Sequence, residues 1–447
     1  MKSTLSWVGI VRLGLVQTAL GAVVVLMTST INRVMSVELA LPAFVPGLLV
    51  ASHYGVQILR PAWGYGSDLG GRRTPWIVGG MGLLALGGTG AALATALASH
   101  FLVAGLALAA LSFVLIGVGV GAAGTSVLTM LATSTTPSRR AAAATVVWVM
   151  MIFGFALTAP LAGHFLDPFS NLRLVEVTGC VSATAFIVAT LAVLGVENGL
   201  ARKALGPSQG GHASKPRFRG ALKDVWRDPA ARRLTIFIFV SMLAYSAQEL
   251  LIEPFAGVVF GMTPGATTKL AGMQHGGVLA GMLTVTFFAS AIGGPVLGSL
   301  RLWTSGGCVA SALSLVAIAA SAYAGPDFPL RWAIFCLGFS NGAFAVSAIG
   351  SMMGLAGAGG GAREGTRMGL WGAAQAIAFG LGGFTGAVSV DIIRRFASET
   401  RTAFAGVFLG EAALFLVAAV LAISIHARKN STPPVFAQPA NRLEAAN

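Results

Sequence analysis

The stretch Gly64–Trp76, GYGSDLGGRRTPW, decides the fold of this chain. It is a short loop, rich in glycine and charge, between two long apolar runs. Because the loop is so short, the chain must turn straight back into an apolar environment after it. Its arginines, Arg72 and Arg73, indicate the side on which it lies, since Lys and Arg are enriched in the cytoplasmic loops of membrane proteins. The loop therefore predicts two antiparallel membrane spans joined on the cytoplasmic side.

The composition of the whole chain agrees with this reading. The 447 residues are 55% hydrophobic and only 10% charged, with a mean hydropathy of +0.80, whereas a soluble domain carries about 25% charged residues. Apolar runs of about 20 residues recur, each long enough to cross the hydrocarbon layer. The 59 glycines suit close helix packing in lipid. We expect an all-α polytopic membrane protein.

The apolar runs predict twelve transmembrane helices in two six-helix halves. We place the predicted spans at residues 9–32, 43–65, 75–97, 102–131, 142–166, 174–196, 233–255, 271–294, 304–324, 330–354, 369–390 and 403–426. The longest polar stretch, 197–232, is a basic cytoplasmic linker between the half 1–196 and the half 233–426. The polar tail, 427–447, is predicted to be disordered.

The charge distribution predicts the orientation. With the amino terminus in the cytoplasm, most of the 29 Lys and Arg residues fall on the cytoplasmic side, so both termini are expected there. The net charge of +14 thus reflects topology and does not indicate a nucleic-acid partner. The loop after span eleven is an exception on the opposite side, with Arg394, Arg395 and Arg401, and the sequence gives no reason for it.

The opening loop also carries a family resemblance. Gly64, Asp68, Gly71, Arg72 and Arg73 match in register the signature G-x-x-x-D-x-x-G-R-R of the major facilitator superfamily. The resemblance implies two packed halves, and we expect the charged residues to control closure of the cytoplasmic side. The alternative is an ordinary basic turn.

A narrower resemblance covers most of the chain. The segments 31–43, 60–77, 248–270 and 363–383 look like the PucC/LhaA group of this superfamily, and the best marker is LIEPFAGVVFGM. The short amino terminus is similar to the subgroup named for a 44-kDa-type chain of bacteriochlorophyll synthase.

The resemblance implies a role with bacteriochlorophyll. Members of the group are regarded as factors that bind this pigment or deliver it to light-harvesting apoproteins, in the bacterial inner (intracytoplasmic) membrane. Partners would be those apoproteins, the prenylating bacteriochlorophyll synthase and the lipid bilayer, with bacteriochlorophyll as cargo and no tightly bound cofactor. No Asp-rich prenyltransferase motif is present, so we expect no catalysis by this chain. Alternatives are a secondary transporter of a small amphipathic solute and a non-catalytic synthase subunit.

Polar side chains in the spans are the candidates for pigment binding. Gln248, Glu249 and Glu253 lie at the predicted end of span seven, before Pro254. Residues four apart share a helical face, and carboxylates in hydrocarbon are costly and usually functional or paired. The two acids predict a gate or a polar contact to the pigment. Alternatively, Glu253 lies in the outer headgroup layer.

Four further residues complete the predicted pigment-binding set. His275 and His53 are possible ligands of the chlorin magnesium, although a lone histidine in a span is more often a hydrogen-bonded structural residue. No firm metal site is predicted. Gln17 and Gln375 are expected to face a central cavity or, alternatively, to make hydrogen bonds between helices.

Overall fold

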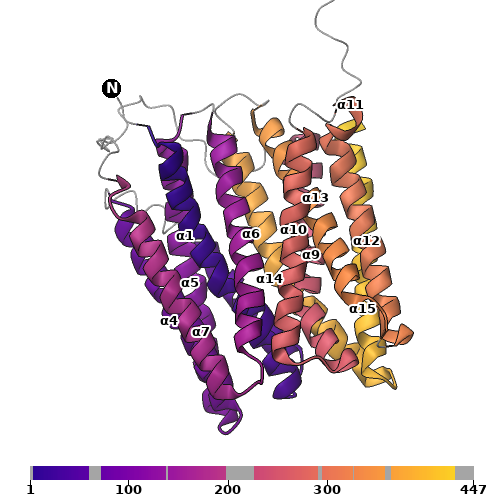
Figure 1. The fold of residues 1–447 in the computed structure, drawn as a ribbon. Helices are drawn as coiled ribbons and strands as arrows, with labels where there is room; N and C mark the ends of the chain where they lie inside the picture. Colours follow the sequence, from indigo (N-terminus) through magenta and orange to yellow (C-terminus); the bar gives the residue numbers. More distant parts are fainter. Residues whose placement is uncertain are drawn as a thin grey trace, which may run out of the picture.

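The computed structural model describes residues 4–59, 72–136, 139–197, 226–289, 294–325, 327–357 and 364–427. These residues form a bundle of long, roughly parallel helices (Figure 1) and contain no strand. The predicted linker falls largely within 198–225 and the predicted tail within 428–447, both outside the described residues.

The first half follows the predicted order. Its helices are α1 (Trp7–Leu26), two π-helical turns η1 (Met27–Ile31) and η2 (Val34–Glu38), α2 (Phe44–Val56), a 3-10 turn η3 (Gln57–Leu59), α4 (Thr74–Ala98), α5 (Leu102–Ser134), α6 (Arg140–Phe165) and α7 (Asn171–Val193). The second half contains α9 (Pro229–Phe260), α10 (Pro264–Phe287), the short α11 (Gly294–Leu297), α12 (Leu300–Ala324), α13 (Leu330–Gly357), α14 (Glu364–Phe396) and α15 (Thr400–Ala427).

The helices have the dimensions of membrane spans. Within the described residues, ten are long and apolar enough to cross a bilayer, and a shorter apolar helix covers Phe44–Leu59. The 24-residue helix α10 lies among them (Figure 1) and completes the twelve predicted spans. The predicted all-α polytopic fold is confirmed.

Each half has its own apolar core. One cluster of buried residues comes mainly from α1 to α7 and includes Met81 and Phe113. A second cluster comes from α9 to α15 and includes Phe344 and Phe415, whose ring centroids lie 5.5 Å apart. Two cores are expected when two bundles of helices pack side by side.

Glycines bring α10 and α13 into backbone contact. A Cβ atom added at Gly338 would lie 2.0 Å from the Gln274 carbonyl oxygen, and one at Gly342 would lie 2.0 Å from that of Val278. The α10 side of the crossing is equally close, because a Cβ at Gly281 would lie 2.1 Å from the Phe339 carbonyl oxygen. Small residues four apart let transmembrane helices approach this closely.

The prediction that a helix ends at Pro254 is wrong. Helix α9 continues through this proline to Phe260, although proline lacks the N–H that would bond the carbonyl of Leu250, four residues earlier. The Asn32 side chain from the first half supplies a donor instead, with Nδ2 2.7 Å from the Leu250 carbonyl oxygen. A side chain of a neighbouring helix thus satisfies the freed group, as transmembrane prolines require.

The structure explains part of the exceptional loop after span eleven. Asp391 near the end of α14 accepts hydrogen bonds from the backbone N–H groups of Ala43 (3.1 Å) and Phe44 (2.8 Å), at the start of α2. Arg394 and Arg395 lie in the last turn of α14, where cations interact favourably with the helix dipole. These charges stabilise helix ends and therefore depart from the usual loop asymmetry.

The third cation, Arg401, contacts one neighbour in sequence and one residue of another helix. Arg401 forms an ion pair with Glu399 and lies over the ring of Tyr323, 5.3 Å from its centroid. The loop between α14 and α15 is thereby attached to the end of α12.

Candidate binding site between the two halves

Glu249 is the more accessible of the two predicted glutamates, and it lies in the C-terminal part of α9. Its side chain is half-buried, as is that of Tyr245 one turn earlier on the same face. Glu249 and Tyr54 of α2 lie close enough to the Tyr245 hydroxyl to interact with it electrostatically. A carboxyl group and two phenols, contributed by both halves, therefore share one region.

Aromatic contacts connect the same helices. The ring centroid of Phe379 in α14 lies 5.3 Å from that of Tyr54 and 5.7 Å from that of Tyr245. We call Tyr54, Tyr245 and Phe379 the central aromatic group. Gln375, also half-buried, lies one turn before Phe379 on the same face of α14. The structure thus brings Gln375 and Glu249 to the same group from two helices.

Glu253, one turn beyond Glu249, is in a different environment. It is only 2% exposed and faces the hydroxyls of Ser29 and Thr267, with Arg33 close enough to act on it electrostatically. Neither carboxyl oxygen meets the geometry of a hydrogen bond. The alternative that Glu253 lies in the outer headgroup layer is wrong, because the side chain is enclosed between the halves.

Arg33 is the charge at the centre of this enclosed region. Its guanidinium forms an ion pair with Glu38 and donates from Nη2 to the Met262 carbonyl oxygen at 2.7 Å. It packs over Gly257 of α9, where an added Cβ would lie 3.0 Å from Nη2. The π-helical turns η1 and η2 flank Arg33, and such turns are frequent at functional sites.

Further polar contacts join the halves near the same end of the bundle. The hydroxyls of Thr30 and Thr268 are 2.9 Å apart. Asp167, after α6, accepts from the Thr263 hydroxyl at 2.9 Å and pairs with Lys269 at 3.3 Å. We name the residues of these contacts, together with those around Glu253, the outer polar cluster: Ser29, Thr30, Asn32, Arg33, Asp167, Glu253, Thr263, Thr267, Thr268 and Lys269.

The two histidines are in separate places. His275 in α10 is buried, its ring centroid lies 4.8 Å from that of Phe155 in α6, and its Nδ1 has no hydrogen-bond partner. His53 in α2 is also buried, and its Nε2 lies 2.9 Å from the Gln57 amide nitrogen. Among the described residues no group of three or more potential metal ligands occurs, so each histidine would act singly.

The two remaining glutamines of the predicted set lie elsewhere. Gln248 is fully buried, and neither polar atom of its amide has a hydrogen-bond partner. The buried residues Ala244 and Leu251 on its helical face belong to the core of the second half. The structure therefore separates Gln248 from Glu249, although the two are adjacent in sequence. Gln17 is 6% exposed on α1, which lies in the first half.

The signature loop is described only at its end. Gly64, Asp68 and Gly71 lie outside the described residues, and Arg72 is exposed. Arg73 donates from its backbone N–H to Glu197 after α7 (2.8 Å) and from Nη1 to the Thr133 hydroxyl of α5 (2.9 Å). Arg73 and Thr133 belong to the first half, and Glu197 is the first residue of the predicted linker, so these contacts of Arg73 join helices and helix ends of that half and do not reach the second half. Closure of the cytoplasmic side by the signature residues stays a prediction.

Glu197 accepts the hydrogen bonds that come from the end of the signature loop and the start of α4. It accepts from the backbone N–H and the hydroxyl of Thr74 at 3.1 and 2.8 Å, as well as from Arg73. Burial acts to raise the pKa of Glu197, but these hydrogen bonds and the charge of Arg73 outweigh it, so the pKa lies below its ordinary value. The carboxylate thereby satisfies free N–H groups at the start of α4.

Sequence reasoning missed several residues that complete the site. Tyr245 could have been found, because it precedes Glu249 by four residues and so shares its face. Asn32 and Arg33 gave no such signal, since their partners come from α9 and the turn after it, in the other half of the chain.

The chain is similar to known proteins along most of its length. The family profile described as "PUCC protein" matches residues 30–430. The "Bacteriochlorophyll synthase 44.5 kDa chain" of Rhodobacter capsulatus is 52% identical over 97% of this chain and 99% of that protein. "Protein PucC" of Rhodobacter capsulatus is 29% identical over 93% of this chain and 92% of that protein.

Solved structures show the fold. The nucleoside transporter NupG superposes with a TM-score of 0.66 at 14% identity, covering 94% of this chain and 100% of that one. A structure described under substrate recognition in proton dependent oligopeptide transporters also gives a TM-score of 0.66 at 14% identity, over 94% and 98% of the chains. The fold is of the transporter type predicted from the signature, the major facilitator type.

Proposed function

Because the chain belongs to the PucC family, we propose that it is a membrane carrier or assembly factor that binds bacteriochlorophyll and delivers it to light-harvesting apoproteins. Its multi-pass helical structure and transporter fold support a non-enzymatic role, and the relatives' names support the link to this pigment. The membrane concerned would be the bacterial inner (intracytoplasmic) membrane, with both chain termini in the cytoplasm.

The observation that carries this proposal is the half-buried Glu249 beside the central aromatic group. A chlorin presents a flat apolar face and polar carbonyl groups at its rim. Aromatic rings pack against flat apolar faces, and a few placed polar groups in an apolar site fix the orientation of a ligand. Tyr54, Tyr245 and Phe379 would contact the ring, while Glu249 and Gln375 would bind its polar rim. Gln17 and Gln248 are buried elsewhere and have weaker support.

Of the two histidines, His275 is the better candidate for the chlorin magnesium. Its Nδ1 has no hydrogen-bond partner, whereas His53 is engaged with Gln57. A pigment at His275 would have to displace the ring of Phe155, which packs on the imidazole at 4.8 Å.

Glu253 would serve a different purpose from Glu249. It lies in the outer polar cluster, to which both halves contribute residues, and its own side chain is only 2% exposed. We assign this cluster to closing one end of the bundle, so the cargo would reach Glu249 from the other end or from the bilayer.

Purification from a phototrophic host in mild detergent tests the pigment assignment. The proposal expects chlorin absorption to co-purify with the wild-type chain and to fall several-fold in Glu249→Gln, with normal protein levels and a lowered yield of antenna complexes. The matched variant Glu253→Gln should retain bound pigment. Unchanged pigment content and antenna yield in Glu249→Gln would contradict the proposed site.

Two other functions lead to different results in the same preparation. A secondary transporter of a small amphipathic solute, favoured by the fold shared with NupG, would bind no pigment and would catalyse solute uptake in vesicles. A non-catalytic subunit of bacteriochlorophyll synthase would co-purify with the prenylating enzyme and carry no bound pigment of its own. Turnover of a pigment precursor by the isolated chain would overturn the non-enzymatic assignment.

A further inference from the structure

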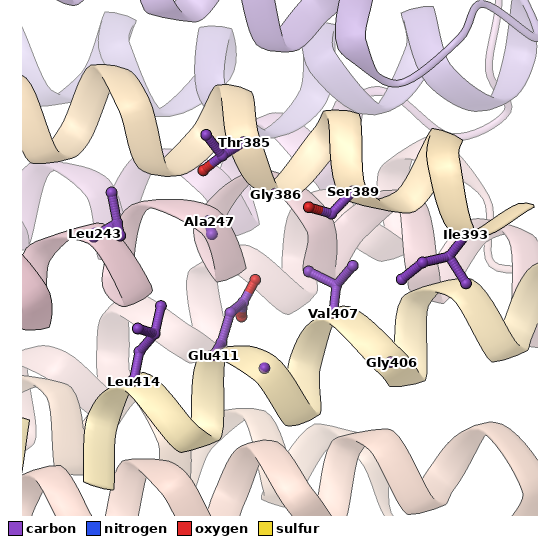
Figure 2. A pocket seen from close by; sticks show the side chains of 11 residues that line it. Leu243, Ala247, Thr385, Gly386, Ser389, Ile393, Gly406, Val407, Glu411 and Leu414 are labelled. Atoms are coloured by element: carbon purple, nitrogen blue, oxygen red, sulfur yellow. The ribbon is translucent and has the colours of Figure 1, made fainter. Parts of the chain in front are cut away.

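A groove of about 290 Å³ lies between α14 and α15, with α9 as its floor (Figure 2). Thr385 of α14 and Gly406 and Gly410 of α15 line it and are exposed. Because these spans are embedded in lipid, the groove opens toward the bilayer. It is separate from Glu249 and the central aromatic group.

Glu411 is the unexplained residue of this groove. Its side chain extends from α15 into the space below Ala247 and Gly386 (Figure 2). It is 3% exposed, and neither carboxyl oxygen has a hydrogen-bond partner. At 1.5 Å per residue, Glu411 lies about 17 Å from the start of α15, near the middle of a hydrocarbon layer about 30 Å thick. An unpaired carboxyl group at that depth is costly and usually functional.

The walls of the groove are built of small residues at helical spacing. Gly406 and Gly410 form a G-x-x-x-G pair on α15, a pattern by which transmembrane helices approach one another closely. Thr385 and Ser389 on α14 are also four residues apart. A Cβ added at Gly410 would meet nothing within 4 Å, so the space above this residue is not filled by the chain itself.

These features select the occupant. A lipid acyl chain offers no hydrogen bond to Glu411. The groove lies just below the size range of small-molecule pockets, about 300–1,000 Å³, and is too small for a tailed macrocycle. A second copy packed on the same patch would oppose one Glu411 to another and supply no donor except a carboxyl group. A transmembrane helix fits the spacing of the walls and can carry a donor side chain.

We propose that this groove docks a single transmembrane helix of another protein, which presents small residues to Gly406 and Gly410 and a hydrogen-bond donor side chain to Glu411. This surface does not depend on the pigment function, because it uses none of the residues assigned to pigment.

Photo-crosslinking in native membranes tests the proposal. A benzoylphenylalanine in place of Leu409, exposed beside the groove, should give an adduct whose cross-linked peptide maps to an apolar membrane span of one partner protein. The matched position Leu313 on α12 is 66% exposed and should not give this adduct. The comparison of Leu409 with Leu313 leaves all residues that line the groove unchanged, so it does not depend on how a groove variant folds.

Variants of the groove then separate its parts. Glu411→Leu removes the acceptor and should lower the adduct by about threefold to tenfold, the range expected for one interhelical polar contact. Gly410→Leu fills the open space and should also lower the adduct, because the docked helix can no longer approach α15. Glu411→Gln keeps hydrogen-bonding capacity and should keep the adduct within about twofold. Adducts with lipid only, a product of two copies of this chain, or an adduct that neither variant lowers would overturn the proposal.

Discussion

The hydrogen bond from Asn32 to the Leu250 carbonyl can be tested quantitatively, because a single residue, Pro254, leaves that carbonyl without its helical donor. Pro254 cannot donate to that carbonyl, and Asn32 does so at 2.7 Å. Replacing Asn32 with leucine, a side chain of similar size, leaves a buried carbonyl unpaired at a cost of about 1–3 kcal/mol. Interhelical hydrogen bonds in membranes average about 0.6 kcal/mol with a maximum near 1.7. We expect a loss of about 1–1.5 kcal/mol in the free energy of unfolding.

The same substitution should cost little when Pro254 is replaced. In Pro254→Ala, the new N–H can bond the Leu250 carbonyl within α9, so Asn32 is no longer required. Asn32→Leu in that background should cost less than about 0.5 kcal/mol, which gives a coupling free energy of roughly 1 kcal/mol in the double-mutant cycle.

Reversible unfolding by SDS in mixed micelles measures all four proteins of the cycle. Asn341→Leu is a suitable control, because Asn341 is also buried and accepts from the Ser311 hydroxyl at 2.8 Å, but it makes no bond to the Pro254 region in the described structure. Its cost should be equal in both backgrounds. An equal cost of Asn32→Leu with and without the proline would show that Asn32 does not replace a hydrogen bond lost at Pro254.

Three further predictions concern helix packing and helix ends. Gly277→Leu should prevent close packing of α10 on α13, because a Cβ there would lie 2.4 Å from a backbone oxygen, whereas a Cβ at Gly276 would meet nothing within 4 Å. Of the two variants Gly277→Leu and Gly276→Leu, only the first should reduce the yield of folded protein in size-exclusion chromatography. Because the pKa of Glu197 lies below its ordinary value in the folded chain, its contribution to stability is complete at a pH above the ordinary pKa and is lost as the pH falls through the lowered pKa. Glu197→Gln should flatten this part of the curve of unfolding free energy against pH. An unchanged curve would contradict the role of Glu197 at the start of α4. Asp391→Ala should remove the cap of α2, lower the free energy of unfolding by about 1 kcal/mol and speed amide hydrogen exchange at Phe44. Equal exchange rates in the variant and the wild type would show that this cap does not stabilise the helix.

The fold was predictable because it depends on features that are local in sequence. Apolar runs between charged loops indicate the spans, and the spacing from Gly64 to Arg73 indicates the family of folds. The boundary at Pro254 was predicted wrongly, because a local rule for proline cannot include a donor such as Asn32 from a helix more than two hundred residues earlier.

The candidate site was predictable only where its members share a helix. Glu249 and Glu253 were chosen together because they are four residues apart, and the structure places one beside half-buried aromatics and the other in an enclosed polar cluster. That difference depends on Arg33 and Tyr54, which reach α9 from the first half. Adjacent Gln248 faces the core of the second half, since a step of one residue turns a helix by about 100°.

The crossing of α10 and α13 affects how well contacts can be inferred from correlated substitutions among relatives of this chain. Where two side chains touch, a change in one can be offset by a change in the other, and this exchange leaves a correlated pair of columns. At Gly338 and Gly342 the neighbours are backbone oxygens of Gln274 and Val278, which every residue type carries. No substitution on α10 can make room for a side chain there. We therefore expect these columns to be constant and statistically silent, so a contact map inferred from sequence covariation would underestimate how closely these two helices approach.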